Sequence, residues 1–154
     1  MAKFCPLFSS STGNSIYIGG GDDSILIDAG MTAKQLEQSL FGIGVDADSI
    51  RNIFITHEHS DHVKGLKVFT KKHKARVFMT QGTYEALVKT DALDNVDECR
   101  IINDDGIDIG CMLIKPFAIF WAKIPVSFIR SPLAQCKLKT VFFVMIFAVS
   151  TSAQ

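Results

Sequence analysis

The sequence lacks the cysteine pattern of a disulfide-stabilised domain and any apolar run long enough to cross a membrane. Its four cysteines form no C-x-x-C pair and no dense array, which indicates reduced thiols and excludes a small secreted disulfide scaffold. A continuous apolar run at residues 141–149 has nine residues, well short of the ~20 that a spanning helix needs. The amino terminus shows no signal-peptide pattern. We therefore expect a cytoplasmic protein without a membrane partner.

The chain also has no formal net charge, because the charges of its 16 basic and 16 acidic side chains cancel. Overall charge therefore predicts no attraction to nucleic acid or membrane. The balance hides an asymmetry: residues 1–110 carry 11 Lys and Arg against 16 Asp and Glu, whereas residues 111–154 carry 5 against none. The second segment also has no histidine, so it offers neither carboxylate nor imidazole side chains to a site.

The length and composition suit one globular domain. With 154 residues, 47% hydrophobic and 21% charged, the chain has no room for a second ordinary domain. Period-two segments predict strands at residues 3–8, 15–18, 24–28, 51–56, 76–79, 99–102, 107–109 and 112–119. Helical periodicity predicts helices after Thr32, over residues 63–74 and over residues 81–89. This alternation indicates an α+β fold in which sheet layers are sandwiched between helices.

The most informative segment, residues 56–62, reads Thr-His-Glu-His-Ser-Asp-His and directly follows an apolar run at residues 53–55. The run is typical of a buried strand that ends where the polar side chains begin. Three imidazoles and two carboxylates so close together suit a divalent metal ion, and zinc, iron and manganese all accept these donors. A solvated polar loop that holds histidines by chance is the alternative, and the density of donors argues against it.

The spacing within this segment favours particular ligands. His57 and His59 are two residues apart at the end of an extended segment, so both imidazoles point to one side and can share one ion. Asp61 and His62 follow where the chain turns into a helix, from where they can reach a second ion about 3.5–4 Å from the first. Glu58 falls on the opposite side and is not an expected ligand.

These residues match H-x-H-x-D-H, the first metal motif of the metallo-beta-lactamase superfamily. Two further regions resemble the YycJ/WalJ branch of that superfamily: residues 4–8 with 11–15, which read Phe-Cys-Pro-Leu-Phe and Ser-Thr-Gly-Asn-Ser, and residues 25–30, which read Ile-Leu-Ile-Asp-Ala-Gly. The resemblance covers residues 1 to about 118. It implies an αββα sandwich of which only the N-terminal half is complete in this sequence.

The resemblance also implies an activity and a set of roles. His57 and His59 would hold one divalent metal ion and Asp61 and His62 another, the ions being zinc, manganese or iron. Asp61, as the catalytic residue, would also orient the nucleophilic water. The implied reaction is exonuclease-type hydrolysis of phosphodiester bonds in DNA, with nucleic acid as the partner. Superfamily relatives with the same motif cleave lactams, thioesters and lactones, so a small-molecule hydrolase stays open.

Beyond residue 118 the resemblance fails. After Pro116-Phe117 the family has a His-Asp-Ala element, where this sequence has Phe120-Trp121. A later Thr-Asp-x-Gly element, whose aspartate bridges the metals in the family, is replaced by the apolar residues 143–147. We therefore divide the chain into residues 1–118, the N-terminal part of the domain, and residues 119–154, a divergent apolar tail. The tail is either truncated or frame-shifted, or else it closes a half-sized fold.

The missing elements leave the expected metal site incomplete. A dinuclear site of the family's kind needs a bridging carboxylate and further histidines besides His57, His59, Asp61 and His62. One ion can still bind to two or three of these side chains and water. The alternative function is therefore a catalytically inactive fragment that at most binds a metal ion. The sequence does not fix the oligomeric state.

Three features outside the motif bear on the site: Asp28, a row of lysines and His73. In the family pattern Asp28 supports the metal loop from behind, and a turn-capping carboxylate is the alternative. Lysines at 64, 67, 71, 72 and 74 line the outer face of the helix over residues 63–74. They can contact a phosphate backbone, but an ordinary solvated face is favoured because the whole chain is neutral. His73 on this helix is expected to be exposed.

Overall fold

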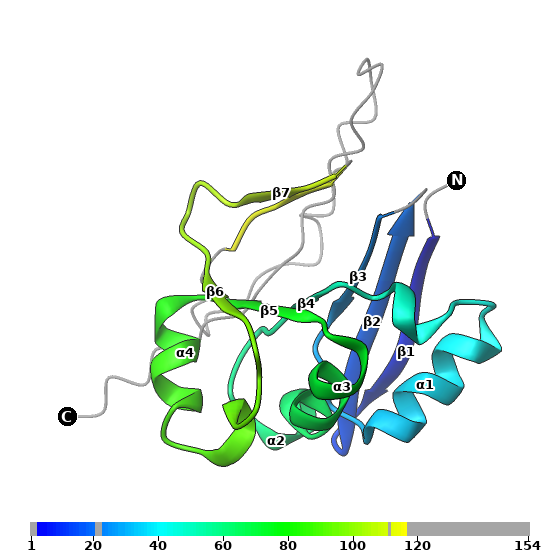
Figure 1. Cartoon of the computed structure of the whole chain (residues 1–154), viewed down its shortest axis with the longest axis horizontal. Coiled ribbons are helices and arrows are strands. Elements are labelled where there is room, and N and C mark those ends of the chain that lie inside the picture. The colour runs from blue at the N-terminus through cyan, green and yellow to red at the C-terminus, as the bar shows by residue number, and fades with distance from the viewer. Residues whose placement is uncertain (1–2, 21–22, 111, 117–154) are drawn as a thin grey trace, which may run out of the picture.

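The main element of the fold is a twisted sheet, seen in a computed structural model that describes residues 3–20, 23–110 and 112–116 (Figure 1). Six strands follow one another in the order β1-β2-β3-β4-β5-β6. They are β1 (Lys3–Ser10), β2 (Gly13–Gly20), β3 (Asp23–Ile27), β4 (Asn52–Phe54), β5 (Arg76–Met79) and β6 (Cys99–Ile101). The first three strands pair antiparallel and β3 to β6 pair parallel. The carboxyl ends of four strands therefore meet at one edge.

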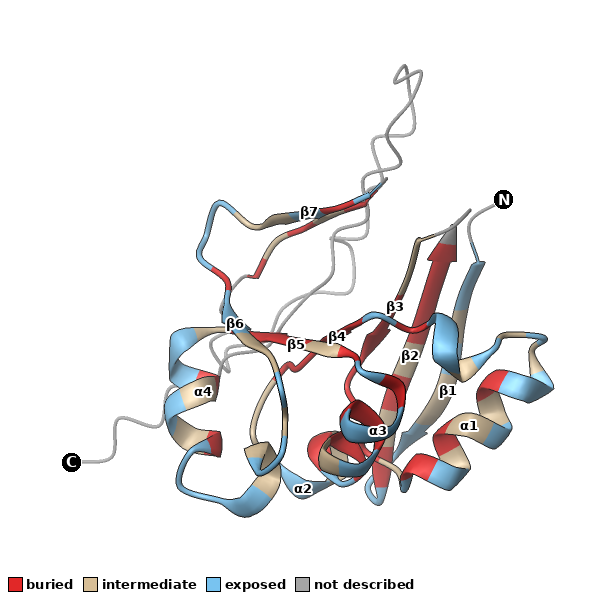
Figure 2. Ribbon diagram, in the orientation of Figure 1, coloured by how far each residue is buried: buried red, intermediate tan, exposed pale blue. Residues whose placement is uncertain are grey.

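Helices connect the parallel strands and cover one face of the sheet (Figure 2). They are α1 (Ala33–Gly42), α2 (Ser60–Val63), α3 (Leu66–His73) and α4 (Gln81–Leu87), with the 3-10 turns η1 (Ala47–Ser49) and η2 (Asp91–Leu93). Leu26, Ile53 and Val77 project from the sheet into this core. Leu36, Phe69 and Leu87 project from the helices to meet them. Burial of these side chains is the main force that holds the helices on the sheet.

The other face of the sheet packs against a hairpin formed by β7 (Ile107–Ile109) and β8 (Met112–Ile114). Ile25, Phe54 and Phe78 from the sheet share a second core with the hairpin residues Ile109, Met112 and Ile114. The expected α+β class with layered sheets is thus confirmed. The proposed tail, residues 119–154, lies outside the described residues.

Two predicted helix starts are confirmed by their caps. The Thr32 side chain accepts from the Gln35 N–H and the Gln35 side chain returns to the Thr32 backbone, which forms a capping box. Thr80 caps α4 through the Thr83 N–H. Leu87 is buried on the inner face of α4, whereas Val88, which follows the last residue of α4, is 57% exposed.

Of the helix predicted over residues 63–74, α3 forms only Leu66–His73; Val63 ends the preceding α2, and the helix is broken at Gly65. The Gly65 N–H donates to the Ala29 carbonyl at 2.8 Å, a bond to another segment in place of an intrahelical one. A Cβ at this position would lie 2.1 Å from the Met31 carbonyl oxygen. The break therefore lets the loop between β3 and α1 approach the segment that carries the histidines.

The expectation that His73 is exposed is wrong. His73 is 6% exposed, its ring lies 4.4 Å from the Phe69 ring, and its two nitrogens face carboxylates of Glu37 (3.1 Å) and Asp48 (2.5 Å). Residues four apart lie on the same helix face. Because Phe69 points inward, its spacing to His73 already favoured a buried histidine, which then needs polar partners.

The cluster around the buried His73 ring predicts a dependence of stability on pH. The hydrogen bond from Lys72, with His73 next, holds the pKa of Glu37 below its ordinary 4.5, and His73 holds the pKa of Asp48 below 3.8. Groups with lowered folded pKa values stabilise the fold above their unfolded values and lose that contribution as the pH falls. We expect wild type to exceed His73→Gln in free energy of unfolding near pH 7.

The difference between wild type and His73→Gln should shrink as the pH falls below 4.5 and then below 3.8, because both carboxylates become protonated. Urea unfolding of both proteins at several pH values measures the difference. Lys71→Gln, an exposed change two residues away on α3, is the control and should follow wild type. A constant difference over the whole range would contradict the role assigned to the cluster.

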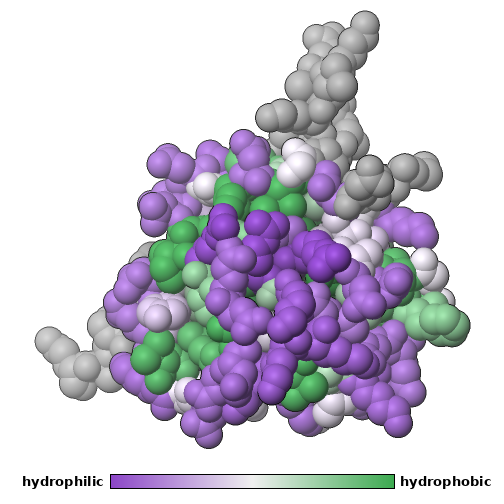
Figure 3. All heavy atoms as spheres, in the orientation of Figure 1, coloured by the Kyte–Doolittle hydropathy of each residue, from purple (hydrophilic) through white to green (hydrophobic). Residues whose placement is uncertain are grey.

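The lysines on the outer face of α3 form part of a solvated surface. The face of the molecule seen in Figure 3 is largely hydrophilic. Three of the lysines are held in ion pairs: Lys67 with Asp94, Lys72 with Glu37 and Lys74 with Asp97. This pairing supports the solvated-face interpretation over a phosphate-binding stripe.

None of the helices in the described part of the chain has the length and apolar character that a bilayer crossing requires.

Candidate metal site

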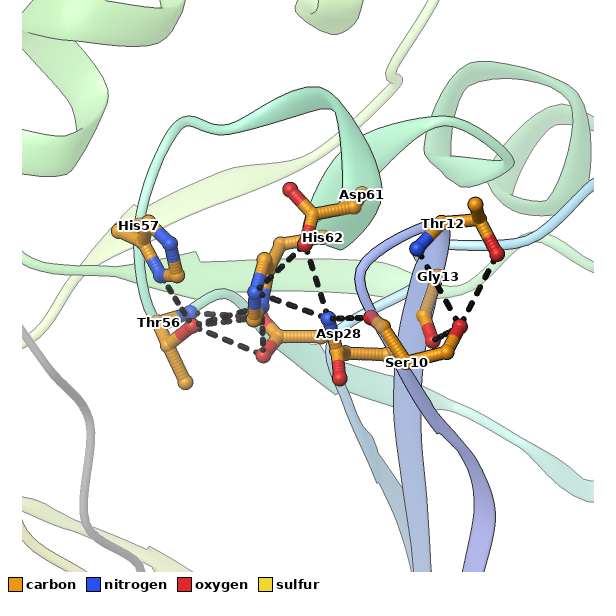
Figure 4. Close-up of polar contacts among 9 residues, drawn as sticks. Ser10, Thr12, Gly13, Asp28, Thr56, His57, Asp61 and His62 are labelled. Atoms are coloured by element: carbon orange, nitrogen blue, oxygen red, sulfur yellow. Dashed lines mark hydrogen bonds and ion pairs between the residues drawn. The ribbon is translucent and has the colours of Figure 1, made fainter.

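The predicted ligands lie at the edge where the parallel strands end (Figure 4). Asp28 directly follows β3, and Thr56 and His57 follow β4 after one buried residue. Asp61 and His62 lie on α2, which begins at the end of the same loop. In open sheets with parallel strands, ligands bind outside the carboxyl ends of the strands. The sequence segment of residues 56–62 therefore occupies the place where a site is expected.

Asp28 connects the two ends of this loop. Its Oδ1 accepts from the Thr56 N–H at 2.8 Å, and the Thr56 hydroxyl lies 2.8 Å from Oδ2. His62 Nδ1 lies 2.7 Å from the same Oδ2 (Figure 4). The Asp28 side chain is only 6% exposed. Of the two interpretations of Asp28, support of the loop from behind is confirmed.

These contacts orient both imidazole rings. The Thr56 hydroxyl has one proton, and it donates that proton to the Asp28 carboxylate, which only accepts when ionised. The hydroxyl oxygen therefore accepts from His57 Nδ1, 2.9 Å away. His62 likewise donates from Nδ1 to Asp28. With the proton on Nδ1, the lone pair of each neutral ring lies on Nε2, which is the arrangement that carboxylate partners give to metal-binding histidines.

Asn14 is a site residue without an assigned role in the sequence analysis. Its Nδ2 donates to Asp61 Oδ2 at 2.9 Å and lies 3.2 Å from His62 Nε2. A third contact, 2.9 Å to the Ser10 carbonyl, fixes the amide at the end of the β1–β2 turn. The residue is distant in sequence from the histidines, so spacing gave no signal. The only hint was its place in the polar turn of residues 11–15 that resembles the family.

The structure brings all four predicted ligands together. The His57 and His59 rings are 4.6 Å apart, and the His57 and His62 rings are 3.9 Å apart, measured between centroids. His62 Nε2 lies 3.5 Å from Asp61 Oδ2. His59 is exposed, whereas the other three are half-buried. The rings thus face one another at the surface, where an ion can reach them from solvent.

Their surroundings shift the pKa values of His57 and His62 in opposite directions. Burial, then the nearby His62, lowers the pKa of His57 below its ordinary value. Burial also acts to lower the pKa of His62, but the hydrogen bond and charge of Asp28, with the charge of Asp61, outweigh it and raise that pKa. His57 is therefore the more readily neutral ring, and the neutral ring is the form that binds metal.

The backbone under the site is held in an unusual conformation. Asp28 has φ +62°, in the left-handed region that few side chains other than Asn and Asp adopt. Its N–H donates to the Phe54 carbonyl and its own carbonyl accepts from the Ser15 hydroxyl, each at 2.8 Å. These bonds from both neighbouring strands stabilise a conformation that would otherwise cost of order 1–3 kcal/mol.

The donors fit a divalent ion in kind, but the described residues do not form a finished cage. Neutral imidazole Nε2 atoms and a carboxylate are ordinary ligands of zinc, iron and manganese. Within the described ranges, no three His, Cys, Asp or Glu side chains converge on one point as a metal-binding group. The donor types therefore suit a metal ion, and binding would require the side chains to move closer together and further ligands or water to complete the site.

A comparison of the sequence with models of protein families identifies the family of this chain. A model of the Metallo-beta-lactamase superfamily matches residues 11–106, a span that contains Asp28 and residues 56–62. The chain belongs to the metallo-beta-lactamase superfamily. The resemblance inferred from H-x-H-x-D-H is confirmed.

Two curated relatives from this superfamily are exodeoxyribonucleases. The chain is 37% identical over 84 residues to Exodeoxyribonuclease YycJ of Bacillus anthracis, an alignment that covers 54% of this chain and 32% of the relative. It is 34% identical over 98 residues to Exodeoxyribonuclease WalJ of Streptococcus pneumoniae, over 64% of this chain and 36% of the relative. The chain thus spans about a third of the length of the curated relatives it matches.

Solved structures show the same fold. The first B3 metallo-beta-lactamase with an active site glutamic acid has a TM-score of 0.56 and 23% identity, over 64% of this chain and 43% of that one. The metallo-beta-lactamase MIM-1 from Novosphingobium pentaromativorans has a TM-score of 0.53 and 21% identity, over 63% and 41%. The chain therefore shares the fold of somewhat less than half of each of these lactamases.

Proposed function

We propose that the chain provides the first metal motif of a metal-dependent hydrolase that cleaves phosphodiester bonds in DNA. The observation that supports it best is the Asp28 and Thr56 network, which places the lone pair of both rings on Nε2. At His62 an ion would replace the 3.2 Å contact between Nε2 and Asn14 Nδ2. The two exodeoxyribonuclease relatives support nucleic acid as the substrate class. Cytoplasmic location stays a prediction.

In this proposal His57 and His59 hold one divalent ion, and Asp61 and His62 hold another. Bound ions of this kind lower the pKa of water toward ~7 and stabilise the charge that develops on a phosphoryl oxygen. Zinc, manganese and iron all suit the donor set.

The protein side chains have separate tasks in this chemistry. Asp28 and Thr56 keep the two imidazole rings in the tautomer that binds metal, and Asn14 holds Asp61 Oδ2. The Asp61 side chain is 27% exposed. Its Oδ1 can therefore accept a hydrogen bond from the attacking water and orient it, which is the catalytic role assigned to Asp61.

The substitution Asp61→Ala tests the proposal. We expect it to reduce any EDTA-sensitive hydrolysis of linear DNA to background, because it removes an ion ligand and the group that orients water. Release of nucleotides from end-labelled DNA with added zinc or manganese measures the rate. Glu58→Gln removes a neighbouring carboxylate that is not a proposed ligand and should keep the wild-type rate. Equal rates in wild type and Asp61→Ala would contradict the role of the motif.

The second candidate is a catalytically inactive fragment that at most binds one ion. It is favoured by the lack of a finished three-residue cage among the described residues. Metal content separates the two candidates. About two ions per chain with turnover supports the hydrolase, whereas one or fewer without turnover supports the fragment. Cleavage of lactones or thioesters in place of DNA would support the small-molecule alternative.

A further inference from the structure

A second polar pocket lies at the opposite edge of the sheet, where the parallel strands begin. It has a volume of about 290 Å³ and is lined by an arginine from the start or body of each of three neighbouring strands, Arg51, Arg76 and Arg100. The sheet register places Arg76 beside Asn52 and Arg100 beside Phe78. Arg51 precedes His57 by six residues, which at ~3.3 Å per extended residue separates the two sites by on the order of 20 Å.

Two of the three guanidinium groups keep their charge available. Arg100 is paired with Glu98, with Nε to Oε1 at 2.6 Å. Arg76 lies over the Phe78 ring at 5.9 Å from its centroid, a contact that leaves its hydrogen-bond donors unused. Among the described residues neither Arg51 nor Arg76 makes an ion pair. Two unpaired guanidinium groups at one pocket are suited to phosphate, which they can bind through paired N–H donors.

A buried amide gives independent evidence for a ligand. Asn52 is 5% exposed and lines the pocket, and its Oδ1 is buried without a hydrogen-bond partner. It is the only side-chain atom of this kind within the described residues. A buried acceptor without a donor costs about 1–3 kcal/mol, so such groups are rare unless something else satisfies them. Because Oδ1 itself is closed off from solvent, a ligand in the pocket that donates an N–H or O–H removes this cost once the Asn52 amide turns toward it.

The other residues that line the pocket indicate the chemistry of the part of the ligand that is not phosphate. Phe78 and Ile107 present apolar surface next to Asn52, and the carboxylates of Asp23 and Asp108 line the pocket as further acceptors, which favour a ligand with donors beside its phosphate. We propose that this pocket binds a phosphate monoester joined to a flat, donor-bearing ring, that is, a nucleoside 5′-monophosphate or the 5′-phosphorylated end of a strand. Arg51 and Arg76 hold the phosphate and Asn52 accepts from the ring. A volume of about 290 Å³ is at the lower end of ligand pockets, which suits one nucleotide and excludes a duplex.

Calorimetric titration of the full chain tests this proposal. The buffer contains EDTA, so that ions at residues 57–62 cannot hold phosphate and the result does not depend on the proposed hydrolase. The probes are 2′-deoxyadenosine 5′-monophosphate, 2′-deoxyadenosine and inorganic phosphate. We expect the monophosphate to bind at least about tenfold more tightly than either part alone, because only it engages both the arginines and the amide.

Variants assign the contacts. The double variant that combines Arg51→Gln and Arg76→Gln should bind the monophosphate at least about tenfold more weakly than wild type. Lys71→Gln with Lys89→Gln removes the same charge from exposed positions on α3 and after α4, and should stay within about twofold of wild type. Asn52→Leu should weaken the monophosphate but leave phosphate binding unchanged, and it should not lower the thermal midpoint, since it replaces an unsatisfied buried acceptor with an apolar group of similar shape.

Short oligonucleotides distinguish the two sources of the ligand. Binding of a 5′-phosphorylated hexanucleotide, but not of its 5′-hydroxyl form, would support a strand end, and binding of the monophosphate alone would support a free nucleotide. Absence of binding for every probe at millimolar concentration would overturn the proposal. Equal affinity of the double arginine and double lysine variants would also overturn it.

Discussion

Asp28→Ala is expected to lower the affinity of the chain for zinc by about 10–100-fold, the usual effect of removing the partner of a metal-binding histidine. It should also lower the free energy of unfolding by about 3 kcal/mol, because it leaves the Thr56 N–H and hydroxyl and His62 Nδ1 without their buried acceptor. Competition titration with a zinc indicator measures the first effect, and urea unfolding with EDTA measures the second.

Asp28→Asn separates these two effects. Asparagine also adopts the positive φ of this position, and its Oδ1 can still accept from the Thr56 N–H. Its NH₂ group cannot accept from His62 Nδ1, so the ring loses the partner that fixes its tautomer. We expect most of the stability to be retained and most of the zinc affinity to be lost. Wild-type zinc affinity in both variants would show that Asp28 has no part in preparing the histidines.

Gly30→Ala is expected to destabilise the protein by about 3 kcal/mol or more, the range of severe overpacking. A Cβ at Gly30 would lie 1.7 Å from the Asp61 carbonyl oxygen and 2.5 Å from the Asn14 amide nitrogen. Both atoms belong to backbone segments that carry site residues, so neither can move without displacing the site. Thermal and urea unfolding measure the loss, and zinc titration of the fraction that remains folded should show weaker binding.

Gly82→Ala is the matched control. This glycine lies in the first turn of α4, and a Cβ there meets nothing within 4 Å. Alanine has the higher helix propensity by up to ~1 kcal/mol, so the variant should be as stable as wild type or slightly more stable. Equal stability of Gly30→Ala and Gly82→Ala would contradict the close packing of the β3–α1 loop against α2.

Much of the fold follows from local sequence patterns. Alternation placed β5 and β7 at their observed residues, and the polar cap Thr32 placed the start of α1. The division of the helix at Gly65 was not predictable, because it depends on close approach of the Ala29 carbonyl from a distant loop. Local periodicity cannot report such a tertiary contact.

The candidate site shows the same limit. The ligands lie within six residues of one another, so spacing alone predicted that His57, His59, Asp61 and His62 would gather. Thr56 and Asn14 were given no role, because a hydroxyl and an amide have no preferred spacing relative to metal ligands. Their importance follows from the sheet, which places the ends of β2, β3 and β4 side by side. For His73 the signal was present in its spacing from Phe69, which the expectation of an exposed ring did not take into account.

The central claim is that Asp28 and Thr56 hold His57 and His62 with protons on Nδ1 and lone pairs on Nε2, ready for a divalent ion. Imidazole nitrogen NMR of ¹⁵N-labelled full chain during zinc titration tests it most directly. The account predicts Nδ1–H tautomers in the neutral rings before zinc, and a shift of Nε2 in both rings as zinc is added. Neutral rings protonated on Nε2, or spectra unchanged at a several-fold excess of zinc, would contradict it.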